Sequence, residues 1–436
     1  MKNYYDVVIV GAGPAGSSAA YEMAGNGLNV AMMERGKKPG DKNVYGGTFY
    51  RRTCQEVFPD FWKDAPWERK VITDEVWFLE KESGVKVGYM DLLFGYPPHN
   101  KFTALRPKVD AWMADKATEQ GAELHLNTLI TDLLFEKSIF NKKKKVRGVK
   151  LHDGKEVEAG VVVLTEGVNA PLTEKAGLRS KFPSHIFTLH SSETLALPPE
   201  KIESRFHLEK DEGAVIGFAG NQMSTVTGKG GIWTNKDTIN ITVGGTLNEL
   251  VEKNVAPEYL LKRFKSHPLI KRLIEGAEVL EYKGKMTVKG GYKYMPKLYD
   301  DGVLVAGDAA MMVKGRRGTD IAMLSGKEAG ETITQAKAKN DFSKKMLANY
   351  EHRLNKTFYL KDIKSKKQVI NYLKQHQDAD HLITSLVNEL AHEFFTEDQK
   401  TSKEEQKTLL KILSKKQLPF KSLEDLIQAI RYWSFA

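Results

Sequence analysis

Gly11-Ala12-Gly13-Pro14-Ala15-Gly16 follows the apolar stretch Tyr5 to Val10, close to the start of a 436-residue chain, and this stretch decides the fold. A buried strand that runs into a Gly-rich turn and then into a helix is the geometry that holds the pyrophosphate of a dinucleotide. Gly11 permits the tight turn, Gly13 lets the phosphates approach the backbone, and Gly16 lets the helix pack against the strand. The N–H groups and the positive dipole end of that helix then face the anion.

The next segment supplies the context that a GxGxxG pattern needs. We expect the helix to run from Pro14 to about Gly25 and a second strand to run from Leu28 to Met33. This strand leads into Glu34, at the spacing where an acidic side chain accepts hydrogen bonds from the adenosine ribose. The alternative is a chance Gly-rich turn in an α/β protein.

Composition limits the remaining possibilities. Hydrophobic residues make up 41% and charged residues 28% of the chain, which is ordinary for a soluble protein. The length predicts two or three domains. We expect no membrane-spanning helix and no signal peptide, and hence a cytoplasmic protein. Cys54 is the single cysteine, so the chain has no internal disulfide and cannot itself supply four cysteines to an iron–sulfur cluster.

The net charge of +10 invites a nucleic-acid interpretation, but its distribution argues against one. Lys142 to Lys145 lies between two strand-like stretches and is expected at a solvated hairpin tip. The lysines that are dense after Thr334 alternate with acidic residues, as on ordinary helix surfaces. We therefore expect no nucleic-acid partner, and a membrane surface or an acidic protein as the better match for the charge.

Two further Gly-rich strand ends follow far along the chain. The apolar stretch Val161 to Leu164 leads into Thr165-Glu166-Gly167, and Val303 to Ala306 leads into Gly307-Asp308. Three such ends suggest one extended ligand, and FAD is long enough to reach them all. Asp308 could instead cap a helix N-terminus.

The order of these patterns predicts the organisation of the chain. A nucleotide-binding pattern fills residues 1–179, a β-rich insertion follows over 180–296, the first pattern returns over 297–340, and residues 341–436 are helical. The histidines lack metal-ligand spacing with supporting carboxylates, so no metal site is predicted.

A set of segments resembles one known family in both sequence and order. The segments are Asp6 to Arg35, Lys42 to Gly47, Leu105 to Trp112, Thr165 to Asn169, Arg205 to Gly220, Tyr294 to Leu298 and Gly302 to Ala310. They resemble the flavoprotein of electron-transfer-flavoprotein:quinone oxidoreductases, particularly FixC-like subunits. The resemblance implies an α/β fold with a Rossmann-like FAD-binding domain of the glutathione-reductase type. It also implies an inserted, mostly antiparallel β-sheet domain for substrate or quinone and a helical C-terminal tail.

The resemblance also implies a set of FAD-binding residues. Some would hold the ADP part, others would flank adenosine and phosphates, and others would approach the ribityl chain and ring. The predicted set is Gly11, Gly13, Pro14, Ala15, Gly16, Glu34, Arg35, Gly46, Gly47, Arg106, Ile130, Glu166, Gly167, Gly307, Asp308, Gly318 and Thr319. Arg106 could merely start a helix beside Pro107, and Gly46 with Gly47 could merely form a turn.

The implied function is an FAD-dependent oxidoreductase that passes electrons from an electron-transfer flavoprotein to a membrane quinone. Its cluster would sit on a separate ferredoxin-like subunit, and the protein would lie at the inner face of the cell membrane. Since flavin performs the electron transfer, no catalytic acid, base or nucleophile is predicted. The alternatives are a geranylgeranyl-reductase-like enzyme that reduces isoprenoid double bonds, a flavin monooxygenase, and a flavin-binding scaffold without turnover.

Two segments qualify this interpretation. The family reads Gly-Asp-Ala-Ala-Gly where this chain has Met311 in the last position, and the segment from Met311 to Arg317 is shorter than usual. Met90 to Pro98 is an apolar, loop-like stretch that predicts a membrane or partner contact. Its Leu92, Leu93 and Phe94 could instead cap the core.

Overall fold

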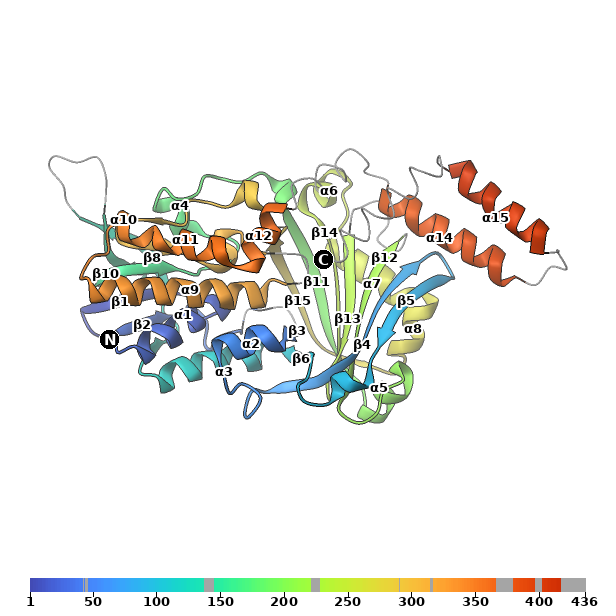
Figure 1. Ribbon diagram of the computed structural model, residues 1–436, viewed down its shortest axis with the longest axis horizontal. Coiled ribbons are helices and arrows are strands. Elements are labelled where there is room, and N and C mark those ends of the chain that lie inside the picture. Colours follow the sequence, from blue (N-terminus) through green and yellow to red (C-terminus); the bar gives the residue numbers. More distant parts are fainter. Residues whose placement is uncertain are drawn as a thin grey trace.

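Two β-sheets, each with its own helices, form the body of the molecule (Figure 1). The computed structural model describes residues 1–41, 43, 46–136, 145–220, 228–289, 291–313, 317–365, 379–396 and 402–416. Lys142 to Lys144 of the expected hairpin tip and the last twenty or so residues of the expected helical tail lie outside these ranges.

The first sheet is the predicted Rossmann-like layer. Its strands run in the order β16–β17–β10–β1–β2–β7, with β9 on β10 and β8 on β9. From β17 to β7 neighbouring strands are parallel, and the other pairs are antiparallel. The bounds are β1 Tyr4–Val10, β2 Val30–Met33, β7 Glu123–His125, β8 Ile130–Phe135, β9 Val146–Leu151, β10 Glu156–Leu164, β16 Tyr299–Asp300 and β17 Val303–Val305. The central strands are almost continuously buried, as in a parallel sheet covered on both faces.

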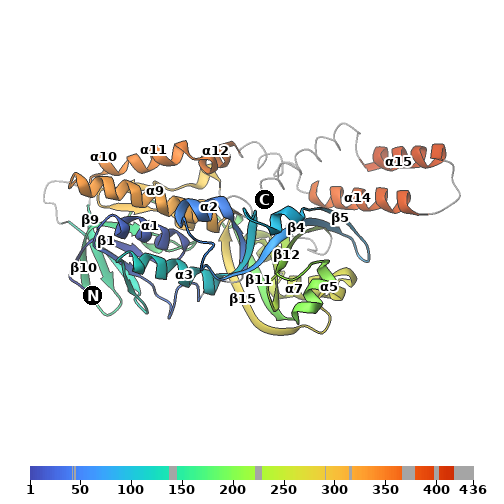
Figure 2. The ribbon, with the colours of Figure 1, turned by 60° about the horizontal axis from the view of Figure 1, so that its bottom comes forward.

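Three helices pack together beside this sheet, namely α1 (Pro14–Gly25), α3 (Arg106–Glu119) and α9 (Thr319–Ala338) (Figure 2). Helix α1 was expected from the sequence over the same residues. Helices α1 and α9 approach so closely that a Cβ on Gly326 would lie 2.1 Å from the carbonyl oxygen of Ala15. Helix α9 therefore packs directly against α1, the first helix of the chain.

The second sheet is mostly antiparallel, in the order β15–β11–β14–β13–β12–β4–β6–β3 with β5 on β4, and only β4 and β12 are parallel to each other. The bounds are β3 Gly46–Tyr50, β4 Trp67–Leu79, β5 Gly84–Met90, β6 Lys101–Leu105, β11 Phe187–Ala196, β12 Glu212–Gly220, β13 Gly228–Thr234, β14 Thr238–Thr246 and β15 Glu278–Val288. Helices α5 (Pro199–Phe206), α7 (Pro257–Ser266) and α8 (Pro268–Ile274) share its apolar core, which includes Ile241 and Phe264.

Residues 46–105 contribute four strands to this second sheet, although the sequence pattern placed them in the first domain. Their membership follows from β4, which pairs with β12 along most of its length and could not be recognised from local periodicity. The domain limits derived from the sequence remain predictions. The expectation that Gly46 and Gly47 lie in a loop or turn was wrong, because both begin β3 and pair with β6.

The C-terminal region is helical wherever it is described, as predicted. Helices α10 (Lys344–Leu347), α11 (Asn349–Lys356) and α12 (Phe358–Ser365) lie over α9, whereas α14 (Ala379–Phe395) and α15 (Ser402–Lys416) lie beyond the second sheet (Figure 1). The Asn388 amide joins α14 to β4 by donating to the carbonyl of Phe78 at 3.0 Å. None of the helices described here combines the length and the apolar character needed to cross a membrane.

Candidate functional site

Three strand ends meet at one edge of the first sheet. Val10 of β1 and Val305 of β17 both lie beside Leu164 of β10, so the chain leaves all three strands at the same level. The Thr165 hydroxyl group bridges two of these ends, because it lies 2.8 Å from the Val10 carbonyl and 2.9 Å from the Gly11 carbonyl. The three strand ends that the sequence singled out therefore lie together at one edge of the sheet, and that they share one ligand remains a prediction.

The first of these ends forms an open anion cradle. Gly11 has a φ of +98°, and a Cβ there would lie 2.9 Å from the Thr165 carbonyl oxygen. A Cβ on Gly16 would lie 2.0 Å from the Gly11 carbonyl oxygen, so turn and helix are in direct contact. Around Gly13, by contrast, no protein atom lies within 4 Å of the Cβ position. The turn thus leaves room in front of the α1 N-terminus, where a pyrophosphate needs it.

Glu34 closes the cradle from the end of β2. Its carboxylate accepts hydrogen bonds from the backbone N–H groups of Ala12 at 3.1 Å and Gly36 at 2.7 Å. These bonds fix the side chain beside the Gly-rich turn. Arg35 is exposed next to it, and Ile130 is buried at the start of β8.

Arg106 is held by a network that reaches α9. It donates to both carboxylate oxygens of the fully buried Asp110, at 2.7 and 2.9 Å, and to the Thr319 hydroxyl at 3.1 Å. Asn43 donates to the same carboxylate at 2.5 Å and accepts a hydrogen bond from Lys285 of β15. Arg106 is thus more than a residue that starts a helix, since its guanidinium joins α3 to the N-terminus of α9.

Asp308 follows β17, in the short 3-10 helix η5 (Gly307–Ala310). The N-cap of η5 is Ala306, so the alternative role of Asp308 as a helix N-cap was wrong for this helix. Burial raises the pKa of the Asp308 carboxyl group, while the nearby charges of Lys285 and Arg106 lower it. Gly318 is the N-cap of α9 and lies directly before Thr319.

Glu166 has a structural task that the sequence pattern did not indicate. Its carboxylate accepts hydrogen bonds from the backbone N–H groups of Leu172 at 3.0 Å and Thr173 at 2.7 Å, at the start of α4 (Pro171–Lys175). Burial raises the pKa of this carboxyl group, and these hydrogen bonds oppose the rise. Gly167 follows with a φ of +80° and open space around its Cβ position.

Met311 stands where the resembling family has glycine, and it keeps a glycine-like backbone. Its φ is +58°, and its side chain is fully buried in a cluster with Phe187 and Val288 of the second sheet and with Val168, which follows β10 of the first sheet. A left-handed conformation is unfavourable for a residue with a Cβ. The packing of the thioether side chain between the two layers offsets this cost.

Sequence reasoning missed the hydrogen-bond network that Lys285, Asn43 and Asp110 form next to Arg106. Asp110 and Asn43 fall within segments that carry the family resemblance, but a carboxylate and an amide have no motif signature of their own. Lys285 lies in the β-rich insertion, where only the fold reveals that β15 borders the nucleotide cradle.

These features fit FAD. The site offers an open approach at Gly13 with helix N–H groups facing it, a carboxylate at the end of β2 and a partly buried cationic cluster. These features suit an extended anionic dinucleotide. The adenosine end and the flavin end of such a molecule would lie at different strand ends of the same sheet edge.

Comparisons with known proteins agree with this geometry. Residues 4–323 match the family model described as FAD binding domain. The protein FixC of Azorhizobium caulinodans is 39% identical over 370 residues, which are 84% of each chain. A probable electron transfer flavoprotein-quinone oxidoreductase of Escherichia coli is 33% identical over 410 residues, 93% of this chain and 94% of that protein.

A solved structure supports the fold. The geranylgeranyl bacteriochlorophyll reductase-like protein of Thermoplasma acidophilum has a TM-score of 0.70 and 20% identity, and the match covers 97% of this chain and 99% of that one. The family match over residues 4–323 establishes FAD as the cofactor. The chain is an FAD-dependent oxidoreductase, and it belongs to the FixC-like flavoproteins of the electron-transfer-flavoprotein:quinone oxidoreductase family.

Proposed function

We propose that this protein takes electrons from an electron-transfer flavoprotein and passes them toward a membrane quinone, together with a separate ferredoxin-like subunit. The observation that carries the proposal is the near full-length similarity to the Escherichia coli protein of that name. The likeness to the geranylgeranyl reductase-like structure shows the fold alone, so it does not favour reduction of isoprenoid double bonds.

Bound FAD supplies the electron transfer itself, and the protein binds, orients and shields it. The Gly11 to Gly16 turn and the α1 N-terminus would hold the pyrophosphate, and Glu34 would hold the ribose. Arg106 would flank the adenosine and the phosphates, and Asp308 would lie toward the ribityl chain. Met311 would exclude water between the two layers, because its buried side chain fills the space there.

An exposed apolar surface supports binding to a membrane. Leu92 and Leu93, in the 3-10 helix η1 (Leu92–Gly95), are 59% and 75% exposed, so the alternative that they cap the core was wrong. Phe94 does pack against the core of the second sheet. We call the exposed set the apolar rim; its members are Val87, Tyr89, Met90, Leu92, Leu93 and Tyr96. Apolar patches of this kind mark membrane or partner contacts.

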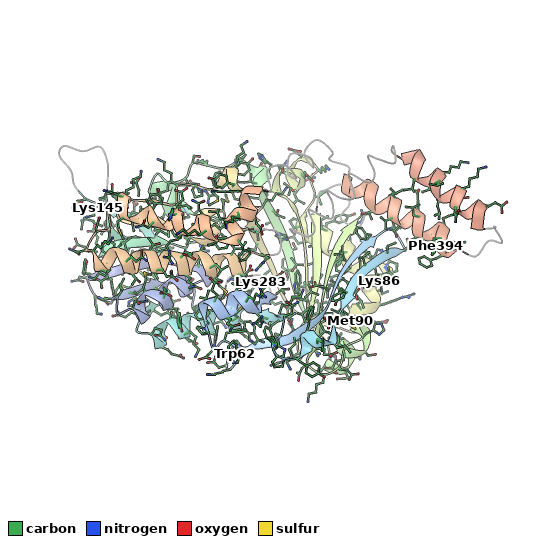
Figure 3. All side chains as sticks on the ribbon, in the orientation of Figure 1. Trp62, Lys86, Met90, Lys145, Lys283 and Phe394 are labelled. Atoms are coloured by element: carbon green, nitrogen blue, oxygen red, sulfur yellow. The ribbon has the colours of Figure 1, made fainter. Side chains whose placement is uncertain are left out.

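A basic side chain lies on the same strand as part of the apolar rim. The rim continues β5, which pairs only with β4 among the described strands, and Lys86 lies on the same strand as Met90 (Figure 3). The Lys86 ammonium group lies 3.8 Å from the ring centroid of Trp77. Apolar side chains beside a cation suit the anionic inner face of a cell membrane.

The single cysteine supports the need for a separate cluster-bearing subunit. Cys54 is buried in α2 (Arg51–Val57). Burial and the charge of Asp320 raise its pKa, which disfavours the thiolate that binds metals. The exposed lysines between α9 and α12 would receive an acidic protein partner; they are Lys339, Lys345, Lys356, Lys361 and Lys364.

The test is rapid-mixing reduction of the bound FAD by a reduced electron-transfer flavoprotein, followed by reoxidation with quinone in liposomes. We expect fast reduction at low salt and a marked slowing near 0.5 M salt, where the Debye length falls to roughly 4 Å. Reduction by NADPH with none by the flavoprotein at any salt would overturn the proposal. A rate that ignores salt would remove only the electrostatic docking surface.

A further inference from the structure

Two lysines of β15 reach from the second sheet to the nucleotide-binding layer. The Lys283 ammonium donates to the carbonyl of Asp41 at 3.3 Å, and the Lys285 ammonium donates to the side-chain oxygen of Asn43. Figure 3 places Lys283 at the junction of the two layers. β15 therefore contacts the segment that follows Glu34 and leads into β3.

The two lysines differ in what surrounds them. Lys283 also pairs with Glu281 at 2.7 Å, on its own strand. Lys285 instead hydrogen-bonds to Asn43, which in turn donates to Asp110. The charged groups that act on Lys285 are Arg106, Asp308, Asp110 and Arg35. All four stand within the FAD-binding segments described above.

The charges around Lys285 do not balance. Asp110 is bound through both oxygens by Arg106 and also accepts from Asn43, so its charge is already compensated. Among the described groups that act on Lys285, Asp308 is the other carboxylate, and it stands against the two cations Lys285 and Arg35. A partly buried site with surplus positive charge favours binding of an anion.

The lowered pKa of Lys285 agrees with a site that binds an anion. Burial lowers the pKa of its ammonium group to about 8, and Arg106 adds to the lowering, while Asp308 and Asp110 oppose it. The side chain is nevertheless only half-buried by solvent exposure. Part of the side chain therefore remains within reach of a bound anion.

We propose that Lys285 is a residue of the FAD site, whose ammonium group pairs with the anionic cofactor and so joins the second sheet to it. Binding of the cofactor would then draw a proton onto Lys285. This inference concerns FAD binding alone, so it holds or fails independently of the electron donor and acceptor proposed above.

The experiment compares Lys285→Met, which removes the charge at similar length, with Lys285→Arg, which keeps it. Lys283→Met is the matched control, since it removes the neighbouring lysine of the same strand. The FAD-free full-length proteins are titrated with FAD, and the dissociation constant is measured by flavin fluorescence from about pH 7 to 9. Thermal unfolding of the FAD-free proteins is recorded in parallel.

Lys285→Met should weaken FAD binding about tenfold at pH 7, as for one lost charge-assisted contact, while Lys285→Arg and Lys283→Met stay within about threefold. Wild-type affinity should fall as the pH rises through about 8, and Lys285→Met should lose this dependence. The charged groups that act on Lys285 are arginines and aspartates, which ordinarily titrate outside this range, and His190 is its cross-strand neighbour.

A Lys285→Met affinity within about threefold of wild type would overturn the proposal, as would Lys285→Arg binding as weakly as Lys285→Met. If Lys285→Met fails to fold, the wild-type pH profile still decides. An affinity that does not change between about pH 7 and 9 would show that no ammonium group near pKa 8 is coupled to FAD.

Discussion

Arg106 and Asp110 stand one helical turn apart in α3 and are joined by two hydrogen bonds, at 2.7 and 2.9 Å. The carboxylate is fully buried, so removing it strands a guanidinium group in a poorly solvated place. We expect Asp110→Ala to lower the free energy of unfolding by about 3–5 kcal/mol, the usual effect of breaking a buried ion pair. Urea unfolding of the FAD-free protein measures the change.

The Arg147–Glu158 pair on the first sheet is the control, because both side chains are largely exposed. Glu158→Ala should cost less than about 1 kcal/mol. Equal losses in the two variants would show that the Arg106–Asp110 pair is no more than a surface contact.

Substitutions at Gly13 and Gly16 should distinguish a loss of FAD binding from a loss of stability. A side chain at Gly13 meets no protein atom within 4 Å, so Gly13→Val should fold but bind no FAD, because it fills the space of the pyrophosphate. A side chain at Gly16 would meet the Gly11 carbonyl oxygen at 2.0 Å, so Gly16→Val should lose stability even without FAD. FAD content and FAD-free melting curves distinguish them; a Gly13→Val protein that retains FAD would contradict the predicted site.

The apolar rim should bind membranes through its most exposed side chains. Leu92→Asp/Leu93→Asp should abolish flotation with anionic liposomes, since two charges would have to enter the interface. Val251→Asp is the matched control, because Val251 is also 72% exposed but lies in α6 (Leu247–Glu252). If all three proteins float equally, the rim is not the anchor.

At position 311 a glycine variant should be more stable than an alanine variant, which is the reverse of the usual order. Both Met311→Ala and Met311→Gly remove a fully buried side chain, which typically costs about 2–5 kcal/mol. Glycine alone accepts the φ of +58° without strain, so Met311→Gly should be the more stable of the two by about 1 kcal/mol. Chemical unfolding of both variants provides the comparison, and a more stable Met311→Ala would show that this backbone is unstrained.

The sequence predicted those parts of the fold that local pattern determines. The β1 strand, the Gly11 turn and α1 each carry their signal within a few residues, and the structure has them where they were expected. Membership of β4 in the second sheet depends on β12, which lies more than a hundred residues away, so no local pattern could reveal it. The same holds for Lys285, whose hydrogen-bond partner Asn43 also lies more than a hundred residues away in sequence.

Side-chain roles were the least predictable part of the site. Glu166 stands at a predicted strand end, yet its carboxylate binds the N-terminus of α4. Leu92 and Leu93 were as compatible with a core position as with an exposed one, because a short apolar stretch has no periodicity that tells the two apart.

The interleaving of the two sheets has a consequence for synthesis on the ribosome. β1 pairs with β10, β10 with β17, β4 with β12 and β11 with β15, so the second sheet is complete only when residues near 288 have emerged and the first only when residues near 305 have emerged. Strands β3 to β6 are made early and must wait with unpaired edges for their partners. Edges of this kind recruit chaperones or aggregate. The nascent chain therefore depends on protection for most of its translation, and truncated forms that end before β17 will be degraded rather than accumulate as folded fragments.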